Sequence, residues 1–134
     1  MIDARQQLKE VTCVRFENTG IEGIVVPFPE LERIMEGVGF VRGGQWDWKR
    51  VTYDFKFENK HDGSVYYLRV PGVAVESEIE RRDAKVEMRT PYLGRHYYPH
   101  GIEYDEEFPV QVVNTSRERL AVLSEALQAF KVEK

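Results

Sequence analysis

The sequence predicts an α+β domain in two layers, in which an antiparallel meander sheet of about five strands packs against two helices. Three observations predict this class. A hairpin pattern runs from Val51 to Val70, an apolar stripe at helical spacing precedes it, and a second helical stripe ends the chain. A half-buried antiparallel sheet must be covered on its apolar face, and helices are the usual cover.

The composition is that of one globular domain. A chain of 134 residues and 15.7 kDa is long enough to bury a single core. Its 42% hydrophobic and 31% charged residues argue against disorder. We therefore expect one domain over residues 1–134, in which residues 1–10 form a frayed end or a short extra helix.

Two short strands and a helix are expected in the first third of the chain. Val11–Phe16 and Ile21–Val26 read as strands separated by a turn. Pro29 suits the first turn of a helix, and Gly39 suits its end. The apolar stripe of this helix has the spacing i, i+3, i+4, i+7 and consists of Leu31, Ile34, Met35 and Val38.

The hairpin is the clearest feature of the sequence. In its first strand, apolar and polar residues alternate, and a period of two places the apolar side chains on one face: Val51, Tyr53, Phe55 and Phe57. Asn59–Ser64 supplies the turn. Asp54, Lys56 and Glu58 share the other face, where alternating charges predict a solvated surface; an acid and base pair in a cleft is the alternative.

The segments that flank the hairpin are less regular. Phe40–Trp48 is strand-like with a bend at Gly43–Gly44. Pro71–Gly72 is expected to end the hairpin ladder, because proline lacks the amide proton. Val73–Ile79 and Ala84–Thr90 then read as two further strands, the first of them a weak or edge strand.

The last long element is a helix with two candidate starts. It begins either after Pro109, behind the acidic residues 105–107, or at a capping box formed by Thr115 and Glu118. Its expected apolar stripe consists of Val113, Leu120, Leu123, Leu127 and Phe130.

The densest group of candidate functional residues lies in Thr90–Glu103, which reads as a loop. Its candidate ligand-binding residues are Tyr92, Arg95, His96, Tyr98, His100 and Glu103. His96 and His100 have the separation that serves zinc on a helix, but Pro99 and Gly101 resist helix formation. No metal site or cofactor is therefore predicted. The alternative is a loop whose rings pack at the sheet edge while hydroxyls and imidazoles bond the backbone.

The remaining features concern partners and location. Trp46 and Trp48 share a face of an extended segment and form a candidate interface. The net charge of -4 argues against nucleic-acid binding over the whole surface, and no apolar stretch is long enough to cross a bilayer. Cys13 is the single cysteine and forms no intrachain disulfide, which favours a cytoplasmic protein.

Four strings of the sequence resemble a known family: Gly39–Trp48, Tyr66–Pro71, Ala74–Ile79 and Pro91–Gly101. They resemble the YugN-like family of small uncharacterised proteins from Bacillus and related Firmicutes, and the resemblance runs from about Phe16 to the last helix. It implies a two-layer α+β domain with an antiparallel meander in a cytoplasmic protein. It implies no catalytic residue and no cofactor.

The sequence thus favours a non-catalytic binding or interaction protein over an enzyme. We expect a homodimer that pairs through a sheet edge or an aromatic patch. The alternative is a small-molecule or metal-binding, enzyme-like protein. Its pocket would be rimmed by Arg95–Glu103 and floored by Tyr53, Tyr66 and Leu68.

Overall fold

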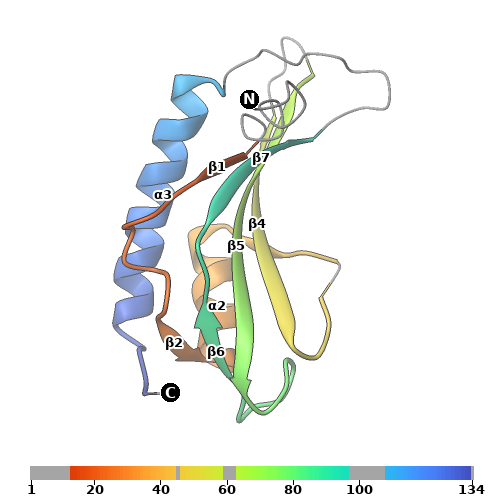
Figure 1. Cartoon of the computed structure of the whole chain (residues 1–134), viewed down its shortest axis with the longest axis vertical. Helices are drawn as coiled ribbons and strands as arrows, with labels where there is room; N and C mark the ends of the chain where they lie inside the picture. Colours follow the sequence, from red (N-terminus) through yellow and green to blue (C-terminus); the bar gives the residue numbers. More distant parts are fainter. Residues whose placement is uncertain (1–12, 45, 59–62, 97–107, 134) are drawn as a thin grey trace, which may run out of the picture.

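A computed structural model describes residues 13–44, 46–58, 63–96 and 108–133, and these form two layers (Figure 1). One layer is a seven-stranded antiparallel sheet, and the other consists of two helices on one face of it. The elements are β1 (Cys13–Arg15), β2 (Val25–Pro27), α2 (Phe28–Val38), β3 (Val41–Arg42), β4 (Arg50–Glu58), β5 (Val65–Glu76), β6 (Lys85–Met88), β7 (Tyr92–His96) and α3 (Val110–Gln128).

The seven strands occupy five positions across the sheet. The order is β1-β7-β5-β4-β3, and β6 pairs with both β5 and β2. β6 and β7 follow each other along one edge of β5, because β7 pairs with its first half and β6 with its second half. The predicted sheet of about five strands therefore exists, but two of its positions are each filled by two short strands.

The expectation that Pro71–Gly72 ends the hairpin ladder is wrong, because β5 continues through both residues to Glu76. The carbonyl of Pro71 accepts the Arg89 amide at 2.8 Å. The backbone N and O of one strand residue point to the same side, so the Pro71 nitrogen, which has no proton to donate, faces the same neighbour as its carbonyl. On that side the ladder is interrupted between β6 and β7, so the proline removes no ladder hydrogen bond there and destabilises the sheet little.

Gly72 has a packing role in the same strand. A Cβ at this position would lie 2.7 Å from Cγ1 of Val86, which is fully buried in β6. A glycine therefore allows β5 and β6 to approach at this point.

The alternation in β4 is confirmed. Val51 and Tyr53 are buried, and Phe55 and Phe57 are partly buried against the core between the sheet and the helices. Met35 of α2 and Leu123 of α3 belong to this core, and the guanidinium of Arg119 in α3 lies 5.1 Å from the Phe55 ring centre. The opposite face of the sheet is open, since no described helix lies over it (Figure 1).

Both helices lie close to their predicted positions. α2 ends at Gly39, whose φ of 102° is a left-handed conformation that glycine adopts without strain. α3 begins directly after Pro109, so Thr115 lies inside the helix and does not cap it. The buried face of α3 contains three of the predicted leucines, Leu120, Leu123 and Leu127. Phe130 does not belong to it, because the helix has ended there and the ring is 48% exposed.

Two other segments differ from the prediction. Tyr92–His96 was expected within a loop but is strand β7, because it lies between β1 and β5 and pairs with both. Phe40–Trp48 contains only the two-residue strand β3. Further along the chain, β3 is followed by a turn in which the Asp47 carboxylate accepts hydrogen bonds from the amides of Lys49 and Arg50, at 2.7 Å each.

Candidate ligand-binding recess

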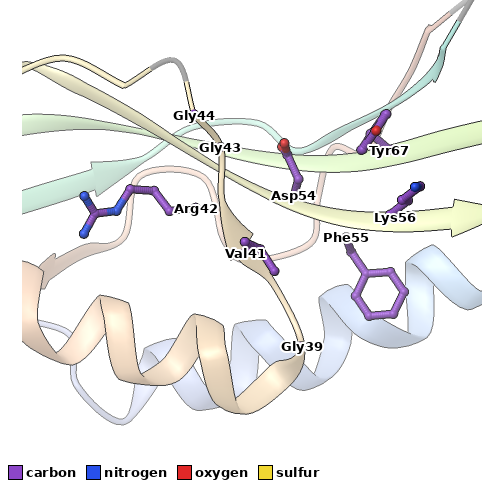
Figure 2. A pocket seen from close by; sticks show the side chains of 9 residues that line it. All are labelled: Gly39, Val41, Arg42, Gly43, Gly44, Asp54, Phe55, Lys56 and Tyr67. Carbon is purple, nitrogen blue, oxygen red and sulfur yellow. The ribbon is translucent and has the colours of Figure 1, made fainter.

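A recess opens where β3 meets β4, and we call it the β3–β4 recess (Figure 2). It has a volume of about 500 Å³ and extends from the open face of the sheet over its edge. Its lining residues are Gly39, Val41, Arg42, Gly43, Gly44, Asp54, Phe55, Lys56 and Tyr67. A concave site with few, well-placed polar groups is the usual form of a small-molecule site.

Asp54 is the most unusual polar group of the recess. Its side chain is 21% exposed, and burial raises the pKa of its carboxyl while the charge of Arg69 opposes this change. Asp54 Oδ1 lies 3.4 Å from Arg69 Nε, yet neither atom has a hydrogen-bond partner in the described part of the chain. A partly buried carboxylate with too few donors gains from an added donor.

Gly43 leaves space for this carboxylate. A Cβ at Gly43 would lie 3.3 Å from Asp54 Oδ2 and 3.3 Å from the carbonyl oxygen of Thr52. The Gly43 amide donates to the same carbonyl at 2.7 Å, so the backbone is held close to β4. The glycine pair that the sequence indicates as a bend therefore forms one wall of the recess.

The other wall carries a tyrosine and a lysine. Tyr67 and Lys56 lie beside Asp54 on the open face (Figure 2). The Arg69 guanidinium lies 5.1 Å from the Tyr67 ring centre, a cation–π contact that orders this part of the surface. The recess thus places a carboxylate, an ammonium group and an aromatic ring around one opening.

Arg42 fixes β3 to the helix layer. Its guanidinium bonds both carboxylate oxygens of Glu32, with Nη2 to Oε1 at 2.6 Å, and also bonds Glu80. It lies 5.4 Å from the Phe28 ring centre and 5.1 Å from the ring of Trp46. The hydrogen bond to Glu32 is the main reason why the pKa of Arg42 is raised. This cluster holds the β3 side of the recess rigid.

Tyr53 belongs to the same cluster through Glu32. Its hydroxyl donates to Glu32, and burial, together with this acceptor, raises the pKa of the phenol far above its ordinary range. Tyr53 therefore stays protonated at neutral pH and acts as a donor.

The residues predicted from the Thr90–Glu103 segment fall into two groups. Tyr92 and Arg95 both lie in β7, but they pair with Arg69 and Tyr66 and so belong to opposite faces of the sheet. Arg95 donates to Ser64 Oγ at 3.2 Å and lies over the Tyr66 ring. His96 is the last residue of β7. Outside the described residues lie Tyr98, His100 and Glu103.

The suggested floor of that pocket has another role. Tyr53, Tyr66 and Leu68 are at most 3% exposed and belong to the core between the sheet and the helices. They face the covered side of the sheet, where α3 and Phe108 pack.

The two candidate interface residues form an edge-to-face pair with ring centres 5.6 Å apart. Trp46 is partly buried and packs against the core, whereas Trp48 is 55% exposed at the Asp47 turn. Trp46 therefore has a structural role through Arg42, and Trp48 is the part of the pair that a partner can reach.

Among the residues that the structure describes, no three side chains of histidine, cysteine, aspartate or glutamate lie together in an arrangement that could hold a metal ion. Neither α2 nor α3, the helices of the described segments, combines the length and apolar character that crossing a bilayer requires.

The sequence pattern predicts the face of Asp54 and Lys56 but not the recess that they line. Asp54 and Lys56 were expected on the solvated face of β4, which is where they lie. Nothing in the pattern shows that β3 pairs with only two residues of β4, and this short pairing leaves the recess open. The available signal is the glycine pair Gly43–Gly44, which the sequence indicates as a bend.

Comparison with known proteins places the chain in a family. The model of the YugN-like family matches residues 17–119. The chain belongs to the YugN-like family. The resemblance found in the sequence is thereby confirmed. The α+β class is confirmed by a solved relative, the uncharacterized conserved protein YugN from Geobacillus kaustophilus HTA426, with a TM-score of 0.78 and 45% identity. The match covers 87% of this chain and 96% of that one.

Other YugN-like relatives come from Bacillus subtilis (strain 168). The uncharacterized protein YlbA is 40% identical over 121 residues, which are 89% of this chain and 99% of YlbA. The uncharacterized protein YugN is 31% identical over 80 residues, which are 60% of this chain and 58% of that protein. These relatives support the fold and the family, and their names carry no activity.

Proposed function

We propose that this YugN-like protein is a non-catalytic binding protein and that its ligand binds in the β3–β4 recess. The observation that carries the proposal is Asp54, a carboxylate that is 21% exposed and lies at the edge of a recess of about 500 Å³, where its Oδ2 faces Gly43. A cationic group with N–H donors matches this carboxylate, and Lys56 favours an acidic group on the same ligand.

The lining of the recess supports binding over catalysis. None of the nine lining residues is a serine, cysteine or histidine, so the recess offers no serine or cysteine nucleophile and no imidazole base. The alternative, an enzyme-like site in Arg95–Glu103, depends mainly on residues outside the described segments. The cytoplasm is the location we propose for this protein, because a single cysteine suits a reducing compartment.

Free L-arginine is a suitable probe for this proposal, because it combines a guanidinium group with a carboxylate. Titration of the ¹⁵N-labelled protein should shift the amide resonances of Gly43, Asp54 and Lys56. Acetate, which lacks the cation, should not shift them. Asp54→Asn should weaken the arginine affinity at least tenfold, on the order expected for a lost charge-assisted hydrogen bond.

Glu58→Gln is the matched control, because Glu58 lies on the same face of β4 but does not line the recess. It should bind arginine as the wild-type protein does. The proposal is refuted by arginine shifts that lie away from the recess, or by an Asp54→Asn variant with unchanged affinity.

A further inference from the structure

Beyond the end of β3, β4 has an edge that no strand of the described residues covers. On the β3 side, the Thr52 carbonyl accepts the Gly43 amide, and Asp54 is the partner of Val41. Peptide groups alternate in direction along a strand, so the amides and carbonyls of Lys56 and Glu58 point to this same side. Those of Phe55 and Phe57 point to β5, where they face Leu68 and Tyr66.

The preceding chain leaves this edge before it reaches Lys56. In the register of β3 and β4, Gly39 would be the partner of Lys56. The Gly39 amide is instead bonded to the carbonyls of Met35 and Glu36 at 3.1 Å each, as part of the end of α2. On the β3 side, no strand described in the structure pairs with β4 at Lys56 or Glu58, whose partners Tyr67 and Val65 lie in β5 on the other side. A free edge of this kind is a template for another strand.

The side chains at this edge are charged and of opposite sign. Lys56 and Glu58 are both exposed on the open face of the sheet, and neither forms an ion pair with another described residue. They are two residues apart, so their side chains share one face of the strand.

Charge selects one register for a second copy of the same strand. With the two-fold axis at Lys56 or at Glu58, a residue would face its own copy and place like charges opposite each other. With the axis at Phe57, Lys56 of each copy faces Glu58 of the other. With the axis at Phe55, Lys56 of each copy would face Asp54 of the other, but Asp54 is already paired with Val41 of β3 on this side.

We propose that the protein forms a symmetric homodimer through the β4 edges, antiparallel, with Phe57 facing its own copy and two Lys56–Glu58 ion pairs across the axis. The two sheets then continue into one. Among the described residues of each copy, Lys56 and Glu58 direct backbone groups to this edge beyond β3, so the contact is small and the dimer is concentration-dependent.

Sedimentation equilibrium of the whole protein, from 10 µM to 1 mM at low salt, tests the proposal. The mass should rise with concentration from 15.7 kDa toward twice that value. Glu58→Lys and Lys56→Glu each place like charges opposite each other, and each should weaken association at least tenfold. The double variant with both substitutions restores opposite charges and should return the dimerisation constant to within threefold of wild type.

Each outcome decides the proposal. A mass that stays at that of one chain up to 1 mM overturns it, as does a dimer that Glu58→Lys does not weaken. Failure of the double variant to recover association overturns the register. Both side chains are exposed, so the variants should fold, and circular dichroism checks that they do. The arginine titration reports on Asp54 and Gly43 in a dilute sample, where the protein is a monomer. Absence of arginine binding would therefore refute the proposed function without bearing on the dimer.

Discussion

Asp54 has fewer hydrogen-bond donors around its carboxylate than an exposed aspartate has in water. Its pKa in the folded chain is raised above the ordinary value of 3.8, first by burial. The folded state therefore binds this proton more tightly than the unfolded state does. In the pH window above 3.8, the Asp54 contribution to stability decreases as the pH rises.

This linkage predicts a pH-dependent effect of Asp54→Asn. The free energy of unfolding of the variant, minus that of the wild type, should increase as the pH rises from 3 to 7. The measurement is urea denaturation at each pH. Asp47→Asn provides the opposite control: backbone hydrogen bonds from Lys49 and Arg50 lower the pKa of Asp47, so the difference for this variant should decrease over the same range. If the stability differences of both variants changed in the same direction with pH, the opposite pKa shifts of Asp54 and Asp47 would be contradicted.

At the scale of single residues, the sequence predicts side-chain direction well and environment poorly. The period of two places Asp54 and Lys56 on the face where they are found, because direction follows from strand geometry alone. The surroundings of the Asp54 carboxylate include Gly43 and Arg69, which are 11 and 15 residues away in the sequence. The local pattern carries no information about such neighbours.

At the scale of elements, Arg42 connects β3 to α2 and to the β5–β6 connection. It does so through Glu32 and Glu80, between the rings of Phe28 and Trp46. A two-residue strand with a single neighbour has little pairing energy of its own, so this side chain is a principal support of the recess wall.

Arg42→Lys should therefore destabilise the fold although it keeps the charge. An ammonium group cannot bond two carboxylates in the planar geometry of guanidinium or stack on both rings. We expect a loss of about 1.5–3 kcal/mol in the free energy of unfolding, measured in urea. Arg33→Lys is the control. Its ion pair with Glu30 involves an arginine side chain that is 72% exposed, and its effect should stay within about 0.5 kcal/mol. Equal losses in both variants would contradict this role.

The two helices and the hairpin could be predicted because each repeats a strong periodic signal within its own length. The continuation of β5 past Pro71 could not, because it depends on a gap in the ladder between β6 and β7. The same holds for β7, which is a strand because β1 pairs with it across the chain. Pairing between distant segments decides both cases, and neither segment shows it alone.

At the scale of the molecule, the sheet has one covered face and one open face, and β5 lies at its centre. β5 pairs with β4 on one side and with β6 and β7 on the other. Backbone amides in such a central strand are protected by ladders on both sides, whereas no described strand protects the edge-facing amides of Lys56 and Glu58 in β4.

Hydrogen exchange at low concentration should reveal this pattern directly. The amides of Phe55 and Phe57 should exchange slowly, because they pair with β5, and those of Lys56 and Glu58 should exchange at least a hundredfold faster. Tyr53, whose amide also faces β5, is the internal reference. Slow exchange at Lys56 and Glu58 in a 10 µM sample would show that another group already covers this edge. At 1 mM their exchange should slow if the edges pair.

The position of β1 and β2 in the sheet has a consequence for synthesis on the ribosome. Both strands pair only with β6 and β7, so they cannot find their partners until residues 85–96 have left the exit tunnel. Translation proceeds at about 5–20 residues per second, so the first apolar segments made, including Val25 and Val26, wait several seconds for those partners. The nascent chain therefore offers chaperones a binding window that closes when β6 and β7 emerge.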